Sequence, residues 1–160
     1  MIDQTQVSVA VHPDLDELVR LESQLFNEDA GVHDPQVDVS WPTRHGREDF
    51  ARLIDLDSAL VLVARRESVV VGHLVGYLTA PSPTRFGRRT AEIRSLYVDS
   101  ASRASGVGQA LVGRFSEWAR ENDATSVSVT SYVANHSARA FYSRLGFAER
   151  SVIFQAVLED

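Results

Sequence analysis

Apolar residues recur along the chain at two kinds of spacing, which together predict an ordered series of helices and strands. Apolar positions three and four residues apart indicate amphipathic helices, whereas short runs rich in Val, Ile and Leu indicate strands. The expected helices cover residues 14–26, 48–56, 108–122 and 136–145. The expected strands cover residues 7–11, 59–64, 69–78, 91–98 and 127–133, followed by one or two strands within residues 147–158.

The order of these elements predicts an α/β chain with a mixed sheet. Residues 59–64 and 69–78 are separated by a short polar break, so they pair most simply as an antiparallel hairpin. Residues 91–98 and 127–133 flank an expected helix, and such a unit needs a right-handed crossover that makes its two strands parallel. Residues 27–47 are rich in Asp, Pro, Gly and His without a period, so we expect a long surface loop there.

Composition and charge narrow the class of protein. At 160 residues the chain has the length of a single domain, and its 44% hydrophobic and 24% charged residues are ordinary for soluble globular proteins. The lack of cysteine excludes a disulfide framework, a thiolate metal site and a cysteine nucleophile. No targeting signal and no apolar run of membrane-spanning length is found, so the expected location is the cytoplasm. A net charge of −6 argues against a nucleic-acid partner and mildly favours a cationic one.

The turn before the helix at 108–122 is the most informative stretch. It reads R-A-S-G-V-G over residues 103–108. A helix N-terminus leaves backbone N–H groups unpaired and carries a partial positive charge, and glycine lets a ligand approach that backbone closely. The stretch alone therefore fits a pyrophosphate site about as well as a tight turn whose glycines serve packing. It has neither the G-x-G-x-x-G of a Rossmann site nor the G-K-[ST] of a Walker loop.

Two linked motifs resemble those of GCN5-related N-acetyltransferases. The first is Arg103-x-x-Gly106-x-Gly108 after Leu96-Tyr97-Val98, and the second is Asn135-x-x-Ala138-x-x-Phe141-Tyr142-x-x-x-Gly146-Phe147. The resemblance is densest over residues 91–147 and fades in the N-terminal third. It implies the GNAT fold, in which a central, mostly antiparallel mixed sheet has a splayed parallel strand pair and about four flanking helices. It also implies transfer of an acetyl group from acetyl-coenzyme A to a primary amine, by direct attack in a ternary complex and without a metal.

The resemblance also implies where the coenzyme binds. Backbone N–H groups of the turn would hold the pyrophosphate, and the N–H near Leu96 would face the thioester carbonyl. Asn135 would contact the pantetheine arm, or would only cap its helix. The implied coenzyme-binding residues are Leu96, Tyr97, Val98, Arg103, Ala104, Ser105, Gly106, Val107, Gly108, Gln109, Asn135 and Tyr142.

Two residues are candidates for proton transfer. Tyr142 matches the family position whose hydroxyl protonates the departing sulfur, although an aromatic residue there otherwise more often belongs to the core. Glu92 lies four residues before Leu96, where several family members carry a base that takes a proton from the amine. A solvent-facing glutamate paired with an arginine is an almost equal interpretation of Glu92. The reserve candidates for a proton relay are Ser131, Tyr132 and His136.

The expected loop and its flanking helices supply the candidate acceptor site. Carboxylates around an aromatic ring would suit a small cationic molecule such as an aminoglycoside or a polyamine. The candidate substrate-binding residues are Glu28, Asp29, His33, Asp34 and Trp41. No metal site is predicted, because no metal-ligand spacing occurs among His33, Asp34, Asp38 and His45.

Several alternatives stay open at this point. The acceptor could be a protein N-terminus or a lysine side chain, and the chain could instead bind an acyl-coenzyme A as a sensor without turnover. The acidic loop could also dock a basic protein, and a homodimer is not excluded. A basic cluster before residues 91–98 is interpreted as a solvated face rather than a contact to the adenosine 3′-phosphate, and it consists of Arg85, Arg88 and Arg89.

Overall fold

The computed structural model describes residues 4–159, which fall into two compact units. The first unit ends at Thr130 and the second begins at Ser131, and each is described by itself. Among the described residues, no helix combines the length and the apolar character needed to cross a bilayer.

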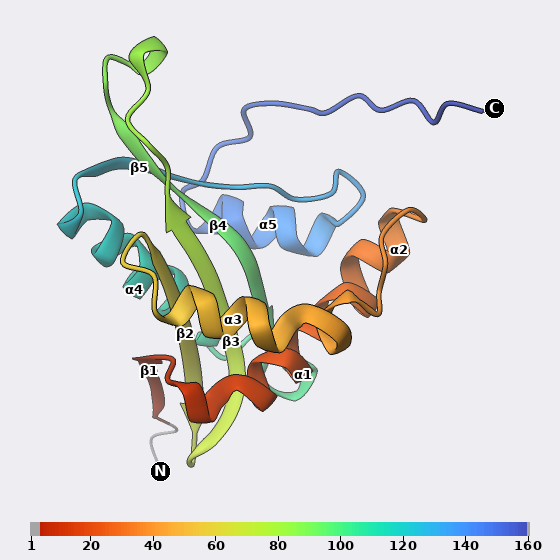
Figure 1. Cartoon of the computed structure of the whole chain (residues 1–160), viewed down its shortest axis with the longest axis vertical. Coiled ribbons are helices and arrows are strands. Elements are labelled where there is room, and N and C mark those ends of the chain that lie inside the picture. The colour runs from red at the N-terminus through yellow and green to blue at the C-terminus, as the bar shows by residue number, and fades with distance from the viewer. Residues whose placement is uncertain (1–3, 160) are drawn as a thin grey trace. The chain divides into compact units, whose positions relative to one another are not determined.

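The first unit is built on a 5-stranded sheet in the order β1-β2-β3-β4-β5 (Figure 1). β1 (Thr5–Val9), β2 (Ala59–Arg66), β3 (Val69–Leu78) and β4 (Arg89–Val98) pair antiparallel, whereas β5 (Ala124–Val129) pairs parallel with β4. The expected hairpin and the expected parallel pair are both confirmed. A mixed sheet with flanking helices also confirms the predicted fold class.

Two helices, α1 (Leu15–Leu25) and α3 (Arg47–Ile54), cover one face of this sheet (Figure 1). Their apolar positions recur at three and four residues, which gathers them on the side that meets the strands. Leu18, Leu21 and Phe50 are fully buried there. Their partners in the core include Val61, Val63 and Val75.

The opposite face is covered by α4 (Val107–Glu121), and glycine makes that contact possible. A Cβ on Gly76 would lie 2.4 Å from the Phe115 ring, so only glycine allows α4 this close to β3. Neighbouring residues of a strand point to opposite faces. His73 and Tyr77 therefore face the α1 and α3 side.

β4 bulges beside β3 and then separates from β5. Val75 pairs with Ser95 but Gly76 pairs with Ile93, which leaves Arg94 as the extra residue of a β-bulge. The pairing of β4 with β5 ends at Ile93, although β4 continues to Val98. Within the first unit, residues 94–98 of β4 therefore have a strand partner on the β3 side only.

The segment expected as a loop, residues 27–47, contains more helix than its composition indicates. π-helical turns cover Phe26–Ala30 and Pro42–Gly46, and the short α2 covers Gly31–His33. The backbone stays right-handed beyond the end of α1, and the rings of Phe26 and Trp41 stack with centroids 6.2 Å apart. The loop prediction was wrong for these turns, because this ring contact holds residues that lack a helical period.

The second unit contains α5 (His136–Arg144) and an extended end. Gly146 follows α5 at φ +91°, a left-handed conformation that glycine adopts freely, as the sequence predicts. The strands expected within residues 147–158 are absent from the described part of the chain, where Ile153 and Phe154 are 78% and 94% exposed. Alternating apolar residues favour an extended backbone, but a strand also needs a neighbour for its hydrogen-bond ladder.

Candidate active site

The edge of β4 that faces away from β3 carries backbone groups without a strand partner in the first unit. Asp99 N–H donates to Val71 O at 2.8 Å on the β3 side. Alternate residues of a strand point their backbone groups to the same side, so those of Leu96 and Val98 point away from β3. β5 has already ended at this level. Leu96 N–H is therefore directed toward an open edge, where it could donate to a ligand carbonyl.

The turn after β4 leads into α4 through an N-terminus that no side chain caps. Gly106 is the N-cap residue, with φ +88°. The N–H of Ala110 donates to Gly106 O at 3.0 Å and is the first to bond within the helix. A Cβ on Gly106 would meet nothing within 4 Å, so space lies open above the turn. Helix geometry leaves three donors without a helical acceptor, namely the N–H groups of Val107, Gly108 and Gln109.

The other residues of this turn shape its backbone. Ala104 has φ +59°, a left-handed conformation that is uncommon for a residue with a Cβ. The hydroxyl of Ser105 donates to Ser102 O and thereby braces the turn. The uncapped donors, the dipole of a 15-residue helix and the open space together fit an anionic group such as a pyrophosphate.

The first residue of the turn, Arg103, reaches toward the helical segment after α1. Its Nη2 lies 2.6 Å from Glu28 Oε2, its Nε donates to Val98 O at 2.9 Å, and its guanidinium lies 5.2 Å from the centre of the Tyr97 ring. The Tyr97 hydroxyl lies 2.8 Å from both Gln24 Oε1 and Glu28 Oε1, so its one proton is shared. The structure thus joins a residue expected at the acceptor site to two expected at the coenzyme site.

The electrostatics of this network follow from its contacts. Partial burial opposes ionisation of Glu28, but hydrogen bonds from Arg103 and Tyr97 and the charge of Arg103 outweigh it and lower the pKa of Glu28. Burial, followed by the hydrogen bond to Glu28 and its negative charge, raises the pKa of Tyr97 to about 12. Glu28 is therefore an ionised acceptor, and Tyr97 stays a donor at any physiological pH.

Glu92 lies directly opposite Tyr77 across the β3–β4 pair, on the face that carries α1 and α3. Burial, then the charge of Glu92 and a hydrogen bond with it, raises the pKa of the Tyr77 hydroxyl. The neighbouring Arg94 instead pairs with Asp49 of α3 at 2.8 Å. Glu92 is therefore a half-buried carboxylate whose cross-strand partner is a tyrosine, rather than a solvent-facing residue.

A buried polar cluster on the same face was not found from the sequence. His73 Nε2 lies 2.6 Å from Glu22 Oε2, and Ser95 Oγ donates to Glu22 Oε1 at 2.8 Å. All three side chains are buried. Burial would raise the pKa of Glu22, but the hydrogen bond and charge of His73, the Ser95 hydroxyl and the charge of Arg94 together lower it.

Two sequence signals could have pointed to this cluster. Glu22 lies four residues after Leu18, in the apolar stripe of its helix, and His73 interrupts an apolar strand. A charged residue at a core position is buried only when it is paired.

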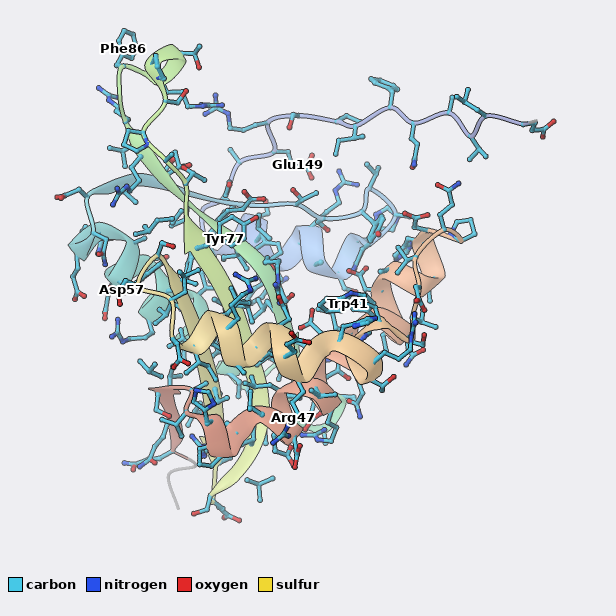
Figure 2. The ribbon with its side chains drawn as sticks, in the orientation of Figure 1. Trp41, Arg47, Asp57, Tyr77, Phe86 and Glu149 are labelled. Carbon is cyan, nitrogen blue, oxygen red and sulfur yellow. The ribbon has the colours of Figure 1, made fainter. Side chains whose placement is uncertain are left out.

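The remaining candidate acceptor residues make local contacts. His33 Nε2 lies 3.6 Å from a carboxylate oxygen of Asp29, and Asp34 Oδ1 accepts from the N–H of Gln36 at 3.0 Å. Trp41, labelled in Figure 2, packs on Phe26 as described above. Glu28 and Asp29 lie in the first π-helical turn, His33 ends α2, and Trp41 precedes the second π-helical turn. Glu28 bonds to Tyr97 of β4 and to Arg103 of the turn that follows it.

The basic cluster lies on the connection between β3 and β4. Phe86 projects at its tip (Figure 2) and is 91% exposed, with the Arg88 guanidinium 5.7 Å from the ring centre. Arg85 and Arg88 are exposed as well. The interpretation as a solvated face fits the exposure of Arg85 and Arg88, whereas Arg89 is half-buried as the first residue of β4.

The second unit holds two further candidates. The Asn135 side chain accepts from Ala138 N–H at 3.1 Å and so caps α5. Tyr142 is half-buried, and its ring makes edge contacts with Phe141 and Phe147 at centroid distances of 5.1 and 5.5 Å. A contact of Asn135 with the coenzyme and an acid role for Tyr142 stay predictions.

Sequence comparison decides the family. Residues 18–147 match the Acetyltransferase (GNAT) family. The chain belongs to this family. The match spans the β4 edge, the turn into α4 and α5, so the expected family resemblance is confirmed, and the bulged, splayed β4 is part of a GNAT acetyltransferase fold.

Curated relatives match over part of the chain. An uncharacterised N-acetyltransferase of Methanocaldococcus jannaschii is 38% identical over 66 residues, which is 41% of this chain and 29% of the relative. N-acetyltransferase 8 of Homo sapiens is 34% identical over 95 residues, which is 59% of this chain and 41% of the relative. The matched part is therefore less than half the length of each of these relatives.

Solved structures resemble nearly the whole chain. A transcriptional regulator from Bacillus halodurans C-125 has a TM-score of 0.76 and 23% identity, covering 97% of this chain and 100% of its own. An aminoglycoside acetyltransferase from an uncultured soil sample has a TM-score of 0.75 and 22% identity, covering 98% and 99%. A second soil aminoglycoside acetyltransferase, solved with sisomicin, has a TM-score of 0.73 and 21% identity, covering 97% of both chains. At these identities the likeness establishes a shared GNAT fold.

Proposed function

We propose that this GNAT chain is an acetyl-coenzyme A-dependent N-acetyltransferase that acts on a primary amine of a small cationic molecule. The observation that carries the proposal is the uncapped N-terminus of α4, which lies beside the open edge of β4. The helix N-terminus suits a pyrophosphate, and the backbone N–H and C=O groups along the β4 edge suit an arm that contains amides. A ligand that carries both parts would therefore fit this place. Coenzyme A has this build, so the residues present fit it.

Each proposed role follows from the chemistry of acetyl transfer. Acetyl-coenzyme A would supply the acetyl thioester. Leu96 N–H would donate to the carbonyl oxygen as negative charge develops there. Glu92 would take the proton that an ammonium acceptor must lose before its nitrogen lone pair can attack. The Tyr142 hydroxyl would donate a proton to sulfur as the carbon–sulfur bond breaks and the carbon–nitrogen bond forms.

Charge and aromatic surface support a cationic acceptor. The chain has a net charge of −6, and the segment from Glu28 to Trp41 contains several carboxylates and a tryptophan. Such surroundings attract polycations by charge and by contact with the ring. Two structural relatives named as aminoglycoside acetyltransferases are consistent with an aminoglycoside or polyamine as the acceptor.

Thiol release tests the proposal directly, because this chain has no cysteine that would add to the signal. The purified protein with acetyl-coenzyme A should release free thiol with spermidine or sisomicin, and much more slowly with peptides that offer an N-terminus or a lysine. Tyr142→Phe should then lower kcat by roughly 100-fold or more, with little change in the Kd of coenzyme A. Release only with peptides would replace the small acceptor by a protein. Binding without any release would favour a sensor.

A further inference from the structure

The Arg103 side chain lies across the part of β4 that the proposed function assigns to the coenzyme. Val98 O belongs to the open edge, and it already accepts from Arg103 Nε at 2.9 Å. The far end of the same guanidinium is held by Glu28 Oε2 at 2.6 Å. One side chain thus bonds to a backbone acceptor of the open edge and is also tied to the π-helical turn Phe26–Ala30, which carries the candidate acceptor residues Glu28 and Asp29.

Glu28 is itself held from a second direction. The Tyr97 hydroxyl lies 2.8 Å from Glu28 Oε1, and the Tyr97 ring is only 5% exposed. Tyr97 therefore holds one oxygen of the Glu28 carboxylate from the buried side, whereas Arg103 holds the other oxygen from the exposed side. The Glu28 and Arg103 side chains are 47% and 48% exposed, so water and ligands can reach this ion pair.

We propose that Glu28 holds Arg103 as a removable latch across the open edge of β4, and that coenzyme binding must break the Glu28–Arg103 ion pair. This inference rests on the proposed function. A ligand pyrophosphate at the uncapped N-terminus of α4 would compete with the Glu28 carboxylate for the guanidinium, which binds both kinds of anion through the same donors. An amide of the ligand's arm would compete with Arg103 for Val98 O.

Opening the latch changes the acceptor side as well. Once Arg103 has left, Glu28 keeps the hydrogen bond from Tyr97 and stays in place, but its negative charge is no longer neutralised. A cationic amine then meets a fixed carboxylate that the unliganded protein keeps paired. Glu28 is on this account a positioning residue that couples coenzyme binding to acceptor binding, and the coupling must act in both directions.

The test is the Kd of coenzyme A, measured by isothermal titration for the wild type, Glu28→Gln and the control Asp16→Asn. Asp16 lies on α1, pairs with Arg47 and is 90% exposed, so the control removes the same charge from another exposed ion pair. Glu28→Gln should bind coenzyme A about 2- to 5-fold more tightly than Asp16→Asn does, because a partly exposed ion pair no longer has to be broken. Equal or weaker binding by Glu28→Gln would overturn the latch.

The same titration in an Arg103→Met background separates the latch from a direct repulsion between Glu28 and the ligand. There Glu28→Gln should leave the Kd unchanged, because the partner that Glu28 restrains is gone. A gain that persists in this background would show that Glu28 acts on the ligand itself, and would overturn the latch while leaving the proposed function intact. No binding of coenzyme A by the wild type would overturn both.

Discussion

Two polar clusters lie two residues apart on the same face of β4, and they differ in what solvent can reach. Glu22, His73 and Ser95 are 2%, 0% and 6% exposed, whereas the Glu28 and Arg103 side chains are about half exposed. In each cluster a carboxylate from the N-terminal helical region bonds to a side chain of β4. The buried carboxylate cannot exchange partners without opening the core, so it fixes α1 on the sheet. The exposed carboxylate can exchange its partner for a ligand.

The largest expected effect is on stability, at the buried cluster. Glu22→Ala should lower the free energy of unfolding by roughly 3–5 kcal/mol, because it leaves His73 and Ser95 buried without their acceptor. Urea unfolding followed by circular dichroism measures this loss. The matched change Glu28→Ala should cost at most about 1 kcal/mol, since that ion pair is partly exposed. Similar losses at the two sites would contradict the distinction between Glu22, which fixes α1 on the sheet, and Glu28, which can exchange its partner.

The next largest effect is the response of the buried cluster to acid. The folded state lowers the pKa of Glu22 below its ordinary 4.5, so ionised Glu22 contributes stability above pH 4.5 that is lost as pH falls through the lower folded pKa. The wild-type advantage in unfolding free energy over Glu22→Gln should therefore shrink on acidification below pH 4.5. Denaturant titrations at a series of pH values measure it. An advantage that stays constant or grows in acid would mean that Glu22 is not held ionised by its partners.

The smallest effect is expected at Tyr97, the buried residue that supports the exposed cluster. Tyr97→Phe removes the hydrogen bond that the hydroxyl shares between Gln24 and Glu28, and it should cost less than about 1 kcal/mol of unfolding free energy. The pKa of Tyr97 is raised to about 12, so a spectroscopic titration of the 4 tyrosines should contain a late component that Tyr97→Phe lacks. Loss of a component with an ordinary pKa near 10 instead would show that Tyr97 does not donate to an ionised carboxylate.

Local patterns predicted most of the architecture. The apolar spacings of α1, α3 and α4 and the polar break between β2 and β3 each act within one element or between neighbours, and the structure follows them. The parallel β4–β5 pair follows from the order of elements alone. The wrong predictions concern segments whose structure depends on residues far away in the sequence. The end of the chain has the composition of a strand without a paired neighbour, and the turns around α2 are held by contacts such as Phe26 with Trp41.

The candidate site likewise has a part that local sequence patterns predicted and a part that depends on contacts between distant residues. The turn at 103–108 is a contiguous motif, so its uncapped helix start could be predicted from the sequence. The Glu22–His73 and Glu22–Ser95 contacts join residues 51 and 73 positions apart, and no local pattern specifies such pairs. Arg103 was predicted as a coenzyme-binding residue, and its ion pair with Glu28, 75 positions away, appears only once α1 lies on the sheet.

The central claim is that the turn into α4 binds the coenzyme, and titration calorimetry of acetyl-coenzyme A tests it most directly. The wild type should bind, and Gly106→Asp should weaken binding roughly tenfold or more, because a carboxylate would stand where the helix dipole attracts phosphate. Gly113→Asp controls for the addition of a carboxylate to α4, since a Cβ there also meets nothing within 4 Å, whereas the φ of +88° at Gly106 adds backbone strain only to Gly106→Asp. Normal binding by Gly113→Asp with weak binding by Gly106→Asp is the predicted result. Absence of binding by the wild type, or equal affinities for a folded Gly106→Asp and the wild type, would contradict the account.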